Sequence, residues 1–356
     1  MNRPTVPEPA IETVREAGLR YGTDRQAGIR RRRAGRGFAY STADDRRANL
    51  SRAARERIRQ LVIPPAWTDV WISADRLSHL QATGRDAKGR KQYRYHARWA
   101  AARGQQKYDQ LLQFADALPA IRRRVSADLK QPPLSQPWVL ATVVRILDRG
   151  MLRIGNEEYA RANGSYGLTT LRNRHVRVRG GRVSFRFRAK SGVLQSIDVA
   201  DPELARALRR CQELTGQLLF QYLDADGEAH SITSTDVNEY LRSVAGPDVS
   251  AKVFRTWTGT LTAARGLGQE PPGPTLRHRQ RTIVRVIDDV ASRLGNTRAV
   301  CRSSYIHPEI LRAYENGLPV KVGRSGNAPP RAGLSVAEQA LRAFLRANRP
   351  AARRAA

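Results

Sequence analysis

The sequence predicts an α+β protein, in which a small β-rich N-terminal domain precedes a larger, mainly α-helical domain that contains a β-hairpin sheet. The length of 356 residues, divided by about 150 residues for an average domain, gives about 2.4 and so predicts two or three domains. Before residue 100, short segments rich in β-branched and aromatic residues predominate, and longer segments with helical apolar spacing follow. Within the helical part, residues 172–190 alternate apolar and basic side chains, which is typical of a hairpin.

The charge of the chain indicates its partner. Lys and Arg number 63 and Asp and Glu number 32, so the formal net charge is +31. Such an excess repels itself unless a polyanion neutralises it, and double-stranded DNA is the partner we expect. No apolar run approaches the roughly 20 residues of a membrane span, and no apolar segment of a secretion signal opens the chain. We therefore expect no membrane partner and a cytoplasmic, nucleoid-associated location.

Motifs for metals and nucleotides are weak. Cys211 and Cys301 have no Cys or His neighbours at zinc-ligand spacing, and two cysteines cannot form a disulfide scaffold. No phosphate-binding glycine loop is present in a strand–helix context, so we expect no nucleotide cofactor. The acidic cluster Asp224-Ala-Asp226-Gly-Glu228 has the composition of a turn, which we favour over a magnesium site. We expect no metal and no other cofactor.

The small domain is predicted over residues 1–100. An Arg-rich segment of about 36 residues opens it and contains the unbroken block Arg30–Arg33, which we interpret as part of a solvated basic arm. A helix is predicted over Asn49–Val62, where a proline pair ends it, and strands are predicted over Trp67–Ile72 and Leu77–Ala82.

Residues 84–99 mix cations with aromatic side chains. They contain six Lys or Arg and one Asp, with Tyr93, Tyr95 and Trp99 interleaved. Cations neutralise phosphates, and aromatic or amide side chains can reach sugars and base edges, so this stretch is a candidate DNA-binding segment. A charged hairpin whose tyrosines pack inward explains the same composition.

The larger domain is predicted over residues 101–322, and residues 323–356 are predicted to be a linker and a C-terminal helix. Gly295 is placed to end one helix, and Ser335 with Glu338 forms a capping box for the last. The other helices are predicted, in order, over 105–118, 138–152, a segment from Pro202 capped by Asp201, 235–245, 250–265 and 275–294.

A cationic hairpin interrupts these helices at residues 172–190. Valines and phenylalanines alternate with arginines on both sides of Gly180-Gly181, which suits a tight turn. A second turn at 189–192 and a strand over 193–199 follow, so Lys190 is predicted at a hairpin tip. A lysine among other cations can donate a proton in phosphoryl transfer without metal, whereas an exposed turn lysine with no function is the plainer alternative.

Six short motifs lie in order between about residues 60 and 310. They are IPPAWTDVWI at 63–72, ATGRDAKGRKQYRY at 82–95, LRIGNEEY at 152–159, NGSYGLTTLRNRH at 163–175, AKVFRTW at 251–257 and LGNTRAVCRSSYIHP at 294–308. Together they resemble the type IB DNA topoisomerases of the poxvirus-like bacterial branch, and several motifs in order are far more specific than one. The resemblance implies an enzyme that relaxes positive and negative supercoils without metal or ATP.

The resemblance also implies a catalytic set. Arg153 and Arg255 match the family's two phosphate-stabilising arginines, and Lys190 matches its general acid. Tyr305 matches the nucleophile, which forms a 3′-phosphotyrosyl link to DNA. The family's usual histidine falls on Asn296, whose amide can donate a hydrogen bond but brings no charge.

DNA contacts outside the catalytic set follow from the same resemblance. Gln92, Tyr93 and Tyr95 match the segment with which poxvirus-type enzymes touch their cleavage site, and Tyr159 matches a phosphate-contacting tyrosine. A monomer whose two domains close around duplex DNA as a clamp is therefore expected. His307 is either a substitute for the family's histidine or a polar loop residue, and we favour the loop residue.

Two other functions remain consistent with the sequence. A tyrosine site-specific recombinase shares the same arginine, lysine and tyrosine logic, but it usually has His-x-x-Arg where this chain has Lys252-Val-Phe-Arg255. A basic DNA-binding protein without enzymatic activity would shift DNA in gels and form no covalent adduct. Strand exchange between two recognition sites would identify the recombinase.

Overall fold

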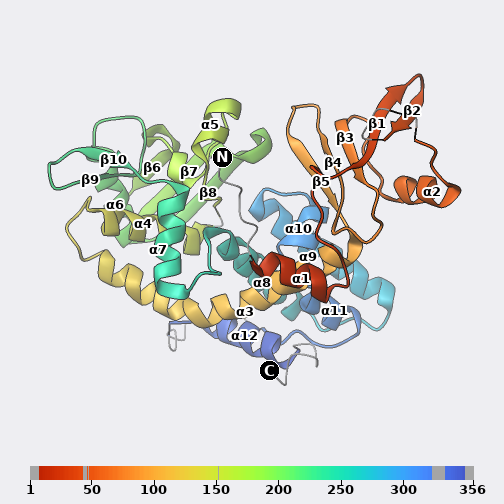
Figure 1. The fold of residues 1–356 in the computed structure, drawn as a ribbon. Coiled ribbons are helices and arrows are strands. Elements are labelled where there is room, and N and C mark those ends of the chain that lie inside the picture. Colours follow the sequence, from red (N-terminus) through yellow and green to blue (C-terminus); the bar gives the residue numbers. More distant parts are fainter. Residues whose placement is uncertain (1–7, 43–45, 47, 151, 323–332, 349–356) are drawn as a thin grey trace. The chain divides into compact units, whose positions relative to one another are not determined.

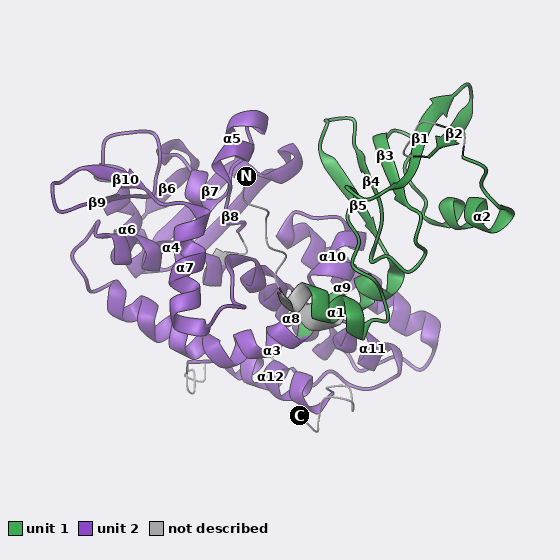
Figure 2. Cartoon of the chain, in the orientation of Figure 1, with its two compact units in different colours: residues 1–108 green, residues 109–356 purple. Residues whose placement is uncertain are grey.

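A computed structural model describes residues 8–42, 46, 48–150, 152–322 and 333–348 (Figure 1). The chain divides into two compact units, unit 1 over residues 1–108 and unit 2 over residues 109–356 (Figure 2). The boundary falls inside the long helix α3 (Ala97–Asp128), and each unit has its own buried apolar core. The predicted α+β fold class is confirmed.

Unit 1 is built on one antiparallel sheet with the strand order β2-β1-β3-β4-β5. Its core lies where Ile58 of the second helix packs with Val70 and Ile72 of the sheet. The predicted helix and both predicted strands are present, although the second strand begins at Leu80 rather than Leu77. The elements are α1 (Glu8–Glu16), β1 (Gly28–Ala34), β2 (Gly37–Ser41), α2 (Arg52–Gln60), β3 (Thr68–Ser73), β4 (Leu80–Arg85) and β5 (Lys91–Tyr95).

The predicted solvated arm is wrong for the described part of the N-terminal segment. That segment contains α1, and the block Arg30–Arg33 lies in β1, which pairs with both β2 and β3. Arg31 is 8% exposed and donates hydrogen bonds to the carbonyl oxygens of Ile63, Pro64 and Trp67. Successive side chains of a strand point to opposite faces of the sheet, and Arg31 is the one that points inward. Because every residue of the block is basic, the sequence shows no alternation from which this burial could be predicted.

Unit 2 is mainly helical and also contains two small sheets. The predicted helices are confirmed, although α3 extends well beyond 105–118. None of the helices in the described ranges is both long and apolar enough to cross a membrane.

The predicted linker, at 323–333, lies outside the described residues except for Gly333. After α3 the elements are α4 (Gln136–Gly150), α5 (Glu157–Asn163), β6 (Val176–Arg179), β7 (Arg182–Arg188), β8 (Leu194–Ala200), α6 (Pro202–Glu213), β9 (Gln221–Leu223), β10 (Ala229–Ser231), α7 (Ser234–Ala245), α8 (Ala251–Gly268), α9 (Leu276–Leu294), α10 (Arg298–Ser304), α11 (Pro308–Glu315) and α12 (Val336–Ala347).

The predicted cationic hairpin is confirmed as β6 and β7, and β8 completes a sheet with the order β6-β7-β8. Val183, Phe185 and Phe187 of β7 are buried in the core of unit 2, whereas the arginines on the opposite face of this strand are exposed. The apolar face thus fixes the sheet against the helices, and the cationic face remains available to a ligand.

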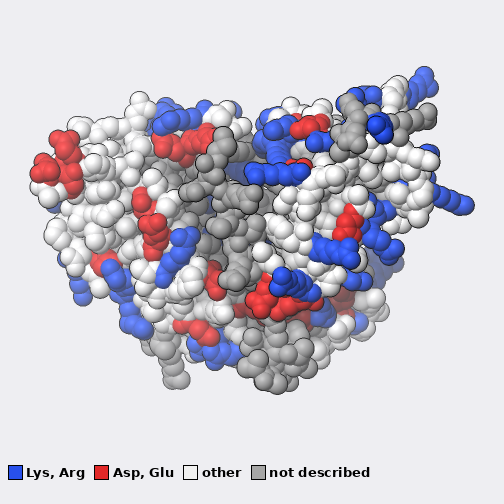
Figure 3. Space-filling model, viewed as in Figure 1, with Lys and Arg blue, Asp and Glu red and all other residues white. Residues whose placement is uncertain are grey.

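Positive charge is denser in unit 1 than in unit 2. Residues 1–108 contain 24 basic and 10 acidic side chains, a net charge of +14. Residues 109–356 contain 39 basic and 22 acidic side chains, a net charge of +17 over more than twice the length. In Figure 3, basic atoms mark the end of the β1–β2 hairpin, and acidic atoms gather at the β9–β10 hairpin.

Candidate active site

Tyr305 lies at the C-terminal end of α10, where its backbone is held against α8. Gly259 of α8 permits this approach, because a side-chain carbon there would lie 2.7 Å from the Tyr305 carbonyl oxygen. Thr260 Oγ1 donates to that oxygen at 3.4 Å and accepts the N–H of His307 at 3.1 Å. Neither Gly259 nor Thr260 stands out in the sequence, because a small residue inside a helix reveals its role only when its neighbour is known.

Arg153 follows α4 in an irregular segment that a second segment holds in place. Gly155, with φ +106°, lies so close to Gly167 that a side-chain carbon on Gly167 would be 2.5 Å from Gly155 Cα. The N–H of Leu168 donates to the Arg153 carbonyl oxygen at 2.9 Å. Backbone contacts alone therefore hold Arg153 in position, independently of the contacts that its side chain makes.

Arg255 projects from α8 and is 3% exposed. Its Nη2 donates to the Leu294 carbonyl oxygen at 2.8 Å, at the C-terminal end of α9, where the helix dipole favours a cation. The guanidinium lies 5.1 Å from the ring centroid of Tyr305 and hydrogen-bonds the Tyr305 side chain. Burial, together with the nearby charge of Arg153, lowers the pKa of Arg255 to about 10.

Asn296 lies on the turn that ends α9. Gly295 has φ +58° and ends this helix, as predicted, and the N–H of Asn296 donates back to the Ala291 carbonyl oxygen. Arg153 Nη2 donates to Asn296 Oδ1 at 2.6 Å and to the Gly295 carbonyl oxygen at 3.3 Å. Asn296 Nδ2 is buried and has no hydrogen-bond partner within the described residues.

The structure thus brings together four of the five predicted catalytic residues, which we call the arginine cluster: Arg153, Arg255, Asn296 and Tyr305. Burial lowers the pKa of both arginines, and their like charges oppose each other. An anion between them would relieve both penalties, and phosphate matches the bidentate geometry of a guanidinium group. The arginine cluster is therefore a candidate site for one phosphate beside a phenol oxygen.

Lys190 is confirmed at the tip of the turn between β7 and β8, but it does not contact the arginine cluster. Its side chain is exposed, and no hydrogen bond or ion pair joins it to another residue in the part of the chain that the structure describes. Ala189 N–H donates to the Val193 carbonyl oxygen and closes the turn. The role of Lys190 as a general acid stays a prediction.

The predicted DNA-binding residues of unit 1 do not all lie on one face of β5. Tyr93 and Tyr95 are 48% and 46% exposed, and their rings stack with centroids 6.0 Å apart. Lys91 Nζ lies 5.8 Å from the centroid of the Tyr93 ring. Gln92 points to the opposite face, where its Nε2 donates to Asp86 Oδ2 at 2.9 Å. The tyrosine pair is therefore presented to solvent, whereas the glutamine supports the β4–β5 hairpin.

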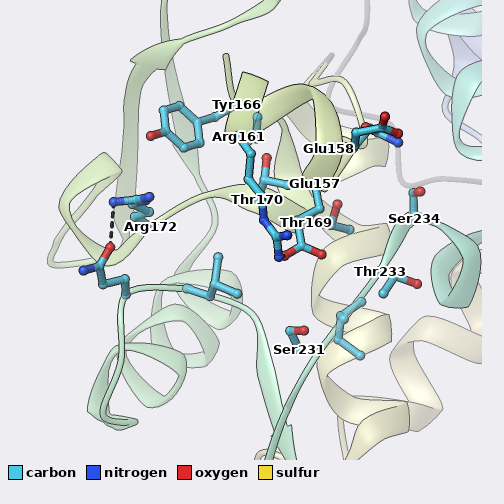
Figure 4. Close-up of a pocket in the computed structure, with 15 residues that line it drawn as sticks. Glu157, Glu158, Arg161, Tyr166, Thr169, Thr170, Arg172, Ser231, Thr233 and Ser234 are labelled. Carbon is cyan, nitrogen blue, oxygen red and sulfur yellow. Dashed lines mark hydrogen bonds and ion pairs between the residues drawn. The ribbon is translucent and has the colours of Figure 1, made fainter. Parts of the chain in front are cut away.

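A pocket of about 390 Å³, lined mainly by residues with polar side chains, adjoins α5, the helix that also carries Tyr159 (Figure 4). Arg161 pairs with Glu157 in its wall. Thr169 also lines the pocket and donates from both its N–H and its Oγ1 to the Ile154 carbonyl oxygen, at 2.7 and 3.1 Å. The pocket wall therefore supports the segment that follows Arg153.

His307 is the N-terminal capping residue of α11. The residue is 8% exposed, and its Nδ1 accepts the N–H of Glu309 at 3.2 Å. Burial lowers the pKa of His307 to about 4, so the imidazole is neutral at pH 7. The favoured interpretation of His307 as a polar residue of the connecting loop stays a prediction.

The acidic cluster forms the turn of the β9–β10 hairpin, as predicted. Asp224 Oδ1 accepts the N–H groups of Asp226 and Glu228 at 3.0 and 2.9 Å, and Oδ2 lies 2.6 Å from His230 Nε2. Within the described ranges, no group of three or more His, Cys, Asp or Glu side chains is arranged to hold a metal ion.

Two segments of the chain match family models of DNA topoisomerases. The family model of the eukaryotic DNA topoisomerase I catalytic core matches residues 94–321, and that of the bacterial DNA topoisomerase IB N-terminal domain matches residues 37–86. DNA topoisomerase 1B of Acanthamoeba polyphaga mimivirus is 30% identical over 296 residues, which cover 81% of this chain and 88% of the viral protein.

More distant relatives agree with these matches. DNA topoisomerase 1 of Schizosaccharomyces pombe is 28% identical over 225 residues, covering 61% of this chain and 26% of the yeast protein. DNA topoisomerase 1B of Vaccinia virus is 25% identical over 146 residues, covering 39% of this chain and 46% of the viral protein. These matches identify the chain as an isomerase that acts on DNA. The chain belongs to the type IB DNA topoisomerase family.

Proposed function

We propose that this topoisomerase relaxes supercoils of either sign through a transient 3′-phosphotyrosyl link at Tyr305, without metal or ATP. The arginine cluster supports the proposal most directly, because the buried Arg255 guanidinium lies against the Tyr305 ring and the partly buried Arg153, which is bonded to Asn296, adds a second positive charge nearby. Positive charge that is arranged before the reaction, in a site largely shielded from water, stabilises a phosphoryl transition state strongly.

In the proposed reaction, Tyr305 Oη attacks a backbone phosphorus, and the bond from phosphorus to the 5′ oxygen breaks. The phenol loses one proton and the departing 5′ oxygen gains one, so atoms and charge balance. The bond energy of the phosphodiester is conserved in the phosphotyrosyl ester, and attack by the 5′-hydroxyl reseals the strand. While the link persists, the free DNA end can rotate and release torsion.

Each catalytic side chain has a distinct role in this scheme. Arg153 and Arg255 stabilise the non-bridging oxygens, and Asn296 Nδ2 supplies a neutral donor to the same oxygens. Lys190 protonates the leaving 5′ oxygen, aided by Arg153. The exposed position of Lys190 at a hairpin tip leaves its side chain free to approach DNA.

We propose that unit 1 supplies DNA contacts that do not take part in the chemistry. Its net charge of +14 and the exposed stack of Tyr93 on Tyr95 support this role, because cations and aromatic rings both bind DNA. Tyr159 is proposed to contact a phosphate near the cleavage site. The working divisions are a clamping domain over 1–100, a catalytic domain over 101–322 and a C-terminal part over 323–356, in a monomer that acts on nucleoid DNA in the cytoplasm.

Covalent trapping tests the mechanism. The full chain is mixed with duplex DNA in EDTA without ATP, denatured with detergent, and the linked residue is mapped by peptide mass spectrometry. We expect an adduct at Tyr305 and relaxation of plasmid by protein that sediments as a monomer. Absence of any adduct would overturn the proposed chemistry, and strand exchange between two sites would favour the recombinase.

A further inference from the structure

Gln195 breaks the alternation of the strand that leaves the Lys190 turn. Along β8, Gln195, Ile197 and Val199 point inward, and Gln195 is only 6% exposed. The neighbouring Leu194 points outward and is 72% exposed. A polar side chain therefore occupies an inward position, and an apolar side chain occupies an outward one. Residues that break a local rule in this way concentrate at functional sites.

The side-chain amide of Gln195 is also unsatisfied. Its Oε1 and Nε2 are both buried, and neither has a hydrogen-bond partner within the described residues. An unpaired buried amide destabilises a fold by about 1–3 kcal/mol, which an apolar side chain of similar shape would avoid. Stability of the free protein therefore gives no reason for a glutamine at this position.

Gln195 faces the turn that anchors the arginine cluster. A side-chain carbon on Gly295 would lie 4.0 Å from Gln195 Nε2. The next residue, Asn296, also has an amide group without a full set of partners among the described residues, because its Oδ1 accepts from Arg153 and its Nδ2 has no acceptor there. The two unused groups are complementary, since Gln195 Oε1 is an acceptor and Asn296 Nδ2 is a donor.

We propose that Gln195 is a positioning residue for strand cleavage, whose Oε1 accepts one N–H of Asn296 when a DNA phosphate occupies the arginine cluster. The Nδ2 amino group has two N–H bonds, so the second is directed at a non-bridging phosphate oxygen. Because β8 leads directly from the Lys190 turn, the same hydrogen bond sets the position of the lysine hairpin relative to the arginines. This inference rests on the proposed function, which supplies the phosphate.

Replacement of the amide tests the proposal. Gln195→Met keeps the length of the side chain and removes both polar atoms. We expect single-turnover cleavage at saturating DNA to slow by about tenfold, the factor that corresponds to about 1.4 kcal/mol of transition-state stabilisation. The melting temperature should stay the same or rise, because an unpaired buried amide is removed. A purely structural role would lower the melting temperature instead, and would overturn the proposal.

A double-mutant cycle with Asn296→Leu provides a second test. Leucine at 296 has no side-chain N–H for Gln195 Oε1 to accept, so adding Gln195→Met to that variant should change the cleavage rate by less than about twofold. Equal losses in the two backgrounds would overturn the proposal.

The matched control is Gln221→Met. Gln221 lies on β9, and its Oε1 is likewise buried without a partner in the described residues. This control should leave cleavage unchanged, and a tenfold loss there would show that the assay responds to any lost amide. Normal cleavage by Gln195→Met would overturn this inference alone, whereas a wild-type protein that forms no adduct would overturn the proposed function as well.

Discussion

The β5 surface of unit 1 and the arginine cluster of unit 2 use positive charge in opposite environments. On β5, Lys91 is exposed beside the exposed rings of Tyr93 and Tyr95 and forms a surface ion pair with Asp24. In the arginine cluster, Arg255 is 3% exposed, and its pKa is lowered to about 10 by burial and by the charge of Arg153. The same kind of charge is solvated in one region and desolvated in the other.

The two regions therefore control different quantities. A solvated cation is screened by salt and interacts weakly with any single phosphate, so a surface of such cations sets affinity. A desolvated cation acts on one phosphate at short range and needs no rearrangement of water, so it sets the rate of reaction at that phosphate. Mutations in unit 1 should therefore change binding, and mutations in the arginine cluster should change chemistry.

Removal of the nucleophile has the largest expected effect. Tyr305→Phe keeps the ring beside Arg255 and removes the oxygen that forms the link, so covalent adduct and plasmid relaxation should fall by at least about 10⁴-fold. DNA affinity, measured by gel shift, should stay close to that of the wild type. A Tyr305→Phe variant that relaxes plasmid would break the comparison, because the nucleophile would lie elsewhere.

Loss of the proposed general acid ranks second. Lys190→Ala should slow cleavage of ordinary DNA by about 10²–10⁴-fold, the usual contribution of a positioned acid. A substrate with a sulfur leaving atom at the cleaved bond needs little protonation and should recover most of that loss. If single-turnover rates show no recovery, Lys190 is not the acid.

Acid should weaken the fold through His307, a buried group close to the arginine cluster. The imidazole titrates near pH 6.5 in the unfolded chain, and its pKa is about 4 in the folded protein, so unfolding gains a proton in this interval. The free energy of unfolding should therefore fall as the pH falls from about 6.5 to about 4, by about 3 kcal/mol from this residue. His307→Asn retains a capping acceptor but has no group that titrates in this range. The decrease in its free energy of unfolding between pH 7 and pH 4.5, measured by denaturant titration, should therefore be smaller than that of the wild type by about this amount.

Substitution of the exposed pair Tyr93 and Tyr95 tests the proposed role of unit 1 in DNA affinity. The double variant Tyr93→Ala/Tyr95→Ala should weaken DNA binding by about tenfold, within the range of about 1–3 kcal/mol for one stacked base. Cleavage at saturating DNA should change little. Gln92→Ala is the matched control on the opposite face of β5, and its affinity, measured by fluorescence anisotropy, should be reduced less. If the tyrosine variant cleaved saturating DNA much more slowly than the wild type, unit 1 would affect the chemistry as well as binding, and the proposed roles of the two regions would be wrong.

Inorganic sulfate should give the smallest effect. An anion in the arginine cluster relieves the repulsion between Arg153 and Arg255, and at ten times its dissociation constant it adds about 1.4 kcal/mol of stability. That corresponds to a rise in melting temperature of about 2–4 °C. Chloride at equal ionic strength is the control, and Arg255→Met should abolish the difference between the two salts. An equal response to both salts would argue against an anion site.

Local patterns in the sequence were sufficient for much of the fold. The hairpin at β6 and β7, the tip position of Lys190 and the helix end at Gly295 all follow from alternation, turn chemistry and capping, which act over a few residues. The same local patterns fail for the all-basic block Arg30–Arg33 of β1, because it offers no contrast between an inward and an outward side chain. The burial of Arg31 depends on the strands beside it.

Sequence motifs predict the candidate catalytic residues, but they do not predict which of these residues contact one another. The helices and strands and the side chains they carry can be predicted from local sequence, because propensity and periodicity are short-range properties. The hydrogen bond from Arg153 to Asn296, 143 positions away, and the approach of the Gln195 amide to the same turn depend on tertiary packing. Contacts between distant segments depend on how whole helices and sheets pack, and that packing is settled by the summed burial of many side chains.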